Sequence, residues 1–123
     1  MSAVRVLVVE DDPNVRGLLR TLLEAEGYAV DTASDGLGAL GQAAASSPAL
    51  VLLDLVMPDL GGLRVLELLR DDPVLERIPV VVVTGHEEAL HGVRTLLGTD
   101  NVFFKPFTVA ELLSRVAAVT GGP

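Results

Sequence analysis

The stretch VLLDLVMP (residues 51–58) sets a single acid, Asp54, into an otherwise apolar run. Strands that are buried on both faces of a parallel sheet read as continuous apolar runs rather than as alternating patterns. A charge in such surroundings costs free energy unless something pairs with it. The stretch therefore predicts a central strand whose acid has a specific partner.

Four further apolar, β-branched runs accompany this one. They occupy residues 4–9, 28–33, 78–83 and 102–104, and the run that ends before Asp54 occupies 49–53. The runs at 4–9, 49–53 and 78–83 are nearly continuous. Apolar residues at helical spacing follow the first run and precede the C-terminus, and helices are expected near 36–46, 62–70 and 87–97. Alternating strands and helices predict an α/β fold, a doubly wound parallel sheet with helices on both faces.

Cap residues support the first and last helices. Asp12 is suited to the N-cap, Pro13 to the first helical position and Gly27 to the exit of the first helix. Thr108 and Glu111 have the spacing of a capping box at the start of the last helix.

Length and charge limit the possible functions. The chain has 123 residues, which suits one domain, expected over 1–120, with 121–123 as a tail or the start of a linker. Its net charge of −8 argues against direct binding of nucleic acid or of an anionic membrane. The chain lacks cysteine, a signal-peptide pattern and any apolar run near the roughly 18 residues of a membrane span, which fits a cytoplasmic protein.

Polar residues follow the predicted strands where each one ends. Glu10 and Asp11 follow the first strand, Asp54 ends the third, Thr84 the fourth and Lys105 the fifth. Ligands of doubly wound sheets bind beyond the carboxyl ends of the strands. If the first and third strands are neighbours, three carboxylates converge at one rim, and a hard divalent cation such as Mg²⁺ would resolve their repulsion.

Four motifs in this order resemble the receiver domain of two-component response regulators, the CheY-like family. They are VVEDD, LLDLVMPDLGG, VVVVTG and FFKPF, and the similarity covers roughly residues 4–119. The resemblance implies a five-stranded sheet of flavodoxin or CheY type with strand order 2-1-3-4-5.

The resemblance also implies a metal and phosphorylation site. Asp54 matches the phosphoacceptor, and Glu10 and Asp11 match the acidic pair that holds Mg²⁺ or Mn²⁺, with Asp11 as the direct ligand. Asp54 itself and the backbone carbonyl of Val56 would complete the protein ligands. An aspartate carboxylate can form an acyl phosphate when charge neutralisation and in-line positioning assist it.

The remaining roles follow from the same resemblance. Thr84 and Lys105 would contact the attached phosphoryl group. A histidine kinase or histidine phosphotransfer protein would supply it, and an output domain or protein would read the change at the helix 4–strand 5–helix 5 face; a homodimer is also possible. The domain would be a stoichiometric phosphoacceptor with slow self-dephosphorylation, not an enzyme.

Two positions depart from the family pattern. Val102 stands where receivers usually carry an aromatic residue three positions before the lysine, so the usual coupling between that residue and Thr84 would be absent or changed. Val56 offers no polar group to orient water near the acyl phosphate, which predicts a phosphoryl lifetime of minutes or longer.

The same residues leave one main alternative, a receiver that acts as a protein-interaction module without phosphorylation. A dehalogenase-type phosphatase would need a second aspartate at position 56. The glycine pattern at 36–41 follows the second strand, not the first as a dinucleotide site requires, and is interpreted as the start of a helix. His86 and His91 are five residues apart, which does not suit a helical zinc site.

Overall fold

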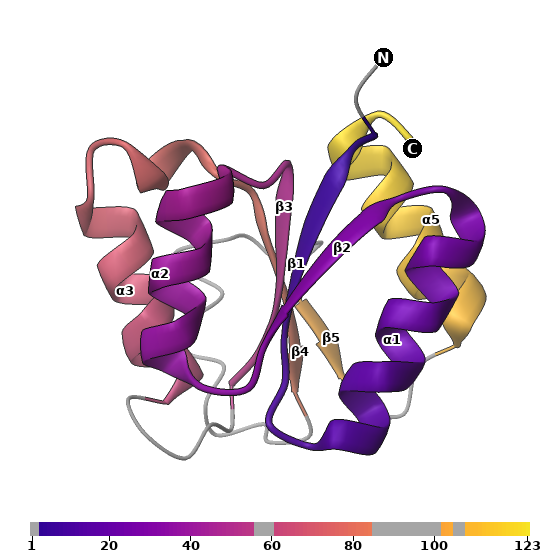
Figure 1. Cartoon of the computed structure of the whole chain (residues 1–123), viewed down its shortest axis with the longest axis horizontal. Coiled ribbons are helices and arrows are strands. Elements are labelled where there is room, and N and C mark those ends of the chain that lie inside the picture. The colour runs from indigo at the N-terminus through magenta and orange to yellow at the C-terminus, as the bar shows by residue number, and fades with distance from the viewer. Residues whose placement is uncertain (1–2, 56–60, 85–101, 105–107) are drawn as a thin grey trace.

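The central feature of the computed structural model is one parallel sheet (Figure 1). The structure describes residues 3–55, 61–84, 102–104 and 108–123, and for Thr84 and 102–104 it describes the backbone. Within these residues the strand order is β2-β1-β3-β4-β5, which confirms the predicted topology. The strands are β1 (Arg5–Val9), β2 (Ala29–Ala33), β3 (Leu50–Asp54), β4 (Val80–Thr84) and β5 (Val102–Phe104).

Helices cover both faces of the sheet. In Figure 1, α1 (Pro13–Glu26) and α5 (Val109–Thr120) lie to the right of the sheet, and α2 (Gly36–Ser46) and α3 (Gly62–Asp71) lie to the left. A short 3₁₀ helix, η1 (Leu75–Arg77), connects α3 to β4. The expected helix at 87–97 lies outside the described residues.

Successive residues of the inner strands enter two separate cores. Val6 and Val8 of β1 pack in the core beneath α1 and α5, whereas Leu7 and Val9 pack in the core beneath α2 and α3. All five residues of β3 are buried. Because β1, β3 and β4 are covered on both faces, their apolar runs are continuous, as the sequence indicated.

The predicted helix ends are confirmed at α1 and α5. The Asp12 carboxylate accepts hydrogen bonds from the amides of Asn14 and Val15 at 2.8 and 3.4 Å, and Gly27 ends α1 in a left-handed conformation, with φ 109°. The Thr108 hydroxyl accepts a hydrogen bond from the Glu111 amide at 3.1 Å. These contacts satisfy backbone groups that the helix itself leaves without partners.

The glycine pattern at 36–41 lies in the first half of α2, which confirms its interpretation as a helix start. Asp35 is the N-cap, and its carboxylate accepts a hydrogen bond of 2.6 Å from the Gly38 amide. His86 and His91 lie outside the described residues. Among the helices that the structure describes, none combines the length and apolar character needed to cross a bilayer.

Candidate functional site

The carboxyl ends of β1 and β3 form the rim that carries the acidic residues. Val9 pairs with Leu53, so the next residue of each strand, Glu10 and Asp54, emerges at the same level. The Glu10 amide donates a hydrogen bond of 3.0 Å to the carbonyl of Ala33, which extends the β1–β2 pairing by one residue. The backbone pairing of the strands is thus sufficient to bring Glu10 and Asp54 to the same level of the rim.

Three carboxylates converge at this rim. One oxygen each of Glu10, Asp11 and Asp54 lies within 4.8 Å of the other two. Glu10 and Asp54 are only 3% and 8% exposed, whereas Asp11 is exposed. Like charges at this separation repel, and they repel more strongly where water is excluded. Hard oxygen donors in such a cluster fit Mg²⁺ or Mn²⁺, which prefer carboxylates together with water molecules.

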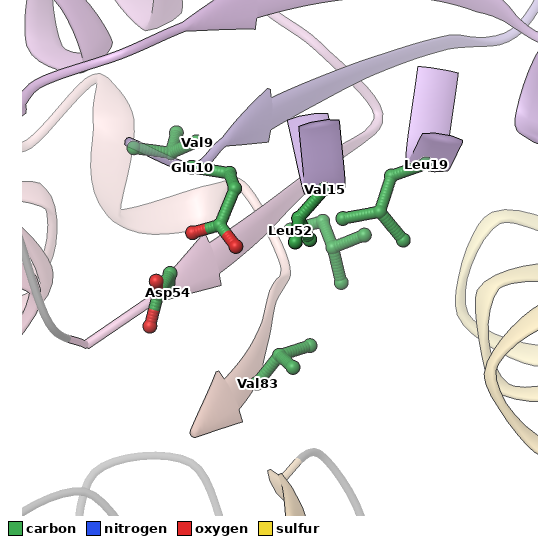
Figure 2. Close-up of a pocket in the computed structure, with 7 residues that line it drawn as sticks. All are labelled: Val9, Glu10, Val15, Leu19, Leu52, Asp54 and Val83. Atoms are coloured by element: carbon green, nitrogen blue, oxygen red, sulfur yellow. The ribbon is translucent and has the colours of Figure 1, made fainter. Parts of the chain in front are cut away.

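A small pocket of about 30 Å³ borders the acids on the side of α1. Figure 2 shows the Glu10 and Asp54 side chains at one end of it, near the ends of β1 and β3, with the Glu10 carboxylate directed toward Asp54. Apolar side chains form the rest of its lining: Val9, Val15, Leu19, Leu52 and Val83. Hydrocarbon therefore flanks Asp54 on the side of α1.

Gly62 holds the chain after Asp54 close to the end of β3. Its amide donates a hydrogen bond of 2.9 Å to the carbonyl of Leu55. A side chain at Gly62 would overlap the backbone of Asp54 and Leu55, so α3 begins directly against the predicted phosphoacceptor.

Arg16 is a residue at this site that sequence reasoning missed. Its Nη1 atom donates hydrogen bonds to the carbonyls of Glu10 and Asp11, at 3.0 and 3.3 Å. The only signal in the sequence is a basic residue five positions after the acidic pair. That spacing does not reveal which groups the guanidinium contacts.

Three other predicted site residues are less fully described. The backbone of Thr84 ends β4 and pairs with Phe104 of β5, so Thr84 lies at the same edge of the sheet as Asp54. Val56 and Lys105 lie outside the described residues. The structure therefore brings together Glu10, Asp11 and Asp54, and leaves the other roles as predictions.

A family model described as the response regulator receiver domain matches residues 6–117. The chain belongs to this receiver family. The receiver domain is 40% identical over 118 residues to the response regulator MprA of Mycobacterium bovis, an alignment that covers 95% of the domain and 50% of MprA. It is 42% identical over 124 residues to the response regulator PleD of Caulobacter vibrioides, covering 98% of the domain and 26% of PleD. The receiver domain thus spans half or less of these relatives.

Solved structures agree with this assignment. The receiver domain superposes on a response regulator from Chloroflexus aurantiacus with a TM-score of 0.88 and 27% identity, covering 98% of the domain and 99% of that chain. It superposes on the response regulator TrrA of Thermotoga maritima, solved in complex with Mg²⁺ and BeF, with a TM-score of 0.82 and 32% identity. That match covers 94% of the domain and 97% of TrrA.

Proposed function

We propose that Asp54 of this receiver domain accepts a phosphoryl group in a reaction that depends on Mg²⁺. The observation that carries the proposal is the convergence of Glu10, Asp11 and Asp54 within 4.8 Å at the rim of the sheet. The similarity to TrrA, whose structure contains Mg²⁺ and BeF, supports it. Bound Mg²⁺ would neutralise the charge of the carboxylates and of the incoming phosphoryl group.

The reaction is a displacement at phosphorus. A carboxylate oxygen of Asp54 forms a bond to phosphorus while the bond from phosphorus to a histidine nitrogen of the donor breaks, and that nitrogen keeps the electron pair. Strand β3 is buried and paired on both sides and holds the nucleophile at its end, and such positioning supplies much of the catalysis in phosphoryl transfer. Glu10 and Asp11 would hold the metal, together with the Val56 carbonyl.

The domain acts as a stoichiometric phosphoacceptor in the cytoplasm. A histidine kinase or histidine phosphotransfer protein is its donor, and Thr84 and Lys105 contact the phosphoryl group once it is attached. The modification then shifts the domain between two states, which an output domain or protein reads at the helix 4–strand 5–helix 5 face. Slow self-dephosphorylation returns it to the starting state.

Incubation with acetyl phosphate and MgCl₂, followed by intact-mass measurement, tests the proposal. Wild-type protein should gain one phosphoryl group per chain, and the gain should disappear with EDTA or in Asp54→Asn. Asp31→Asn is the matched control, because Asp31 lies on β2 and pairs with Arg5 at 2.9 Å, away from the acidic rim. This control should gain the group as the wild type does.

Two results would contradict the proposal. Equal mass gain in wild type and Asp54→Asn would show that another residue is modified. Absence of any mass gain, and of any spectral change with beryllofluoride and Mg²⁺, would favour the alternative of an interaction module that works without phosphorylation.

A further inference from the structure

Arg16 donates hydrogen bonds to three consecutive backbone carbonyls in the loop that carries the acids. Arg16 Nη1 donates to the carbonyls of Glu10 and Asp11, at 3.0 and 3.3 Å. The backbone amide of Arg16 donates to the carbonyl of Asp12 at 2.9 Å. The guanidinium therefore holds the peptide units that follow Glu10 and Asp11, whereas the bond to Asp12 is the first backbone bond of α1 and needs no particular side chain.

The consequence for the two acids is geometric. The backbone dihedrals of a residue link the direction of its carbonyl to that of its Cα–Cβ bond. With the Glu10 and Asp11 carbonyls held by the guanidinium of α1, the Cα–Cβ bonds of both residues keep the direction from which their carboxylates reach the rim beside Asp54. The Asp12 carboxylate is engaged separately, as the N-cap of α1.

We propose that Arg16 is a positioning residue for the metal site: it orients Glu10 and Asp11 so that they bind Mg²⁺ with Asp54. The inference rests on the proposed metal site. It assigns Arg16 no contact with the metal, the phosphoryl group or the reacting atoms. Groups that orient metal ligands in this way typically contribute about tenfold or more to metal affinity.

A purely electrostatic role predicts the opposite sign. The Arg16 guanidinium carries a positive charge close to the acids, and this charge would repel a divalent cation. If charge were the main effect, removing Arg16 would strengthen Mg²⁺ binding. If orientation is the main effect, removing Arg16 weakens binding although a repulsive charge has been lost.

Mg²⁺ titrations of folded protein, followed by amide NMR shifts at constant ionic strength, separate the two roles. Arg16→Met keeps the aliphatic length and removes the donors, and we expect its dissociation constant for Mg²⁺ to rise roughly tenfold. Arg16→Lys keeps the charge and one donor group, and its affinity should fall between those of Arg16→Met and the wild type. An unchanged or tighter affinity in Arg16→Met, or an affinity in Arg16→Lys no higher than in Arg16→Met, would overturn the proposal.

The matched control is Arg20→Met, one turn further along α1. Arg20 bonds only to the exposed Glu24 carboxylate among the described residues, at 3.2 Å, and its removal should leave Mg²⁺ affinity within about twofold of wild type. If Arg16→Met does not fold, Arg16→Lys decides alone: weaker binding than wild type supports orientation, and unchanged binding overturns it. Failure of both variants to fold would assign Arg16 to the fold and overturn the proposal.

The same titration separates this inference from the proposed function. Wild-type protein that binds Mg²⁺ and is phosphorylated, with Arg16→Met equal to it, would remove the role of Arg16 and leave the proposed function intact. Wild-type protein that does not bind Mg²⁺ would overturn both.

Discussion

Gly62 packs against the backbone of Asp54 so closely that a β-carbon at position 62 would overlap the Asp54 carbonyl oxygen and the Leu55 α-carbon. The two residues are eight positions apart, and the hydrogen bond from the Gly62 amide to the Leu55 carbonyl closes the gap between the end of β3 and the start of α3. Only glycine permits this approach without a shift of one element or the other.

Gly62→Ala should therefore damage both stability and phosphorylation. Displacing α3 from β3 to make room for a methyl group costs about 1–3 kcal/mol in a packed region. The displaced Asp54 should also react more slowly with acetyl phosphate. Urea denaturation and the mass assay measure the two effects, and a variant as stable and as reactive as wild type would show that the contact relaxes without cost.

Gly41→Ala should have the opposite effect on stability. Gly41 lies on the exposed side of α2, and an added β-carbon would meet nothing within 4 Å. Alanine in a helix interior is favoured over glycine by about 0.5–1 kcal/mol, so the free energy of unfolding should rise by that amount.

Gly38→Ala is the comparison for this gain. A β-carbon there would stand 3.0 Å from the Asp35 carboxylate oxygen that caps the helix, so the cap must shift and the gain should be lost. Equal stabilisation by both substitutions would contradict this account of the cap.

Arg70→Met should destabilise the connection from α3 to β4. The Nη1 atom of Arg70 donates hydrogen bonds of 2.9 Å to the carbonyls of both Glu76 and Ile78. Burial lowers the pKa of Arg70, and the Glu76 carboxylate opposes that shift, so the cation is partly compensated where it lies. Loss of both bonds should cost about 1–3 kcal/mol in urea denaturation.

Arg64→Met provides the control for Arg70. Arg64 forms an exposed ion pair with Glu67 at 3.5 Å, and such pairs contribute little. Its loss should change the free energy of unfolding by less than about 0.5 kcal/mol. Similar losses in the free energy of unfolding for the two substitutions would show that the hydrogen bonds from Arg70 to the Glu76 and Ile78 carbonyls do not stabilise this connection.

Asp54→Asn should be more stable than wild type in EDTA and less stable than wild type when Mg²⁺ is added. In EDTA the substitution removes one of three neighbouring charges, and relief of the repulsion should stabilise the fold by on the order of 1 kcal/mol. With Mg²⁺ at about 100 times its dissociation constant, wild type gains about 2.7 kcal/mol by mass action, whereas the variant gains less. Thermal unfolding in the two buffers measures both differences, and the same rank order in each would contradict a shared metal site.

Much of the fold was predictable because the apolar runs are continuous and the helix ends carry recognisable caps. The predicted ends of the strands were less accurate. The apolar run at 78–83 begins two residues before β4, because the Ile78 amide bonds to the Leu75 carbonyl and closes η1 instead of joining the sheet. Burial and strand pairing are different properties, and an apolar pattern reports only the first.

The acidic cluster was predictable because parallel strands bring their carboxyl ends to one edge. The contacts of Arg16 and Gly62 were not, since they depend on the path of the loops that join β1 to α1 and β3 to α3, which residue types alone do not specify. A basic residue five positions after an acidic pair, or a glycine eight positions after an aspartate, is equally compatible with an exposed helix face or an ordinary loop.

The alternation of β3 between two cores has a consequence for how this chain can change in length. Leu50 and Leu52 face the α1 and α5 core, Val51 and Leu53 face the other core, and Asp54 borders the α1 pocket. Inserting or deleting one residue within β3 would exchange the two sets beyond that point and place a leucine where Asp54 belongs. The position of Asp54 thus depends on the number of residues in β3. The strand tolerates substitution of one apolar residue for another, but not the insertion or deletion of a residue.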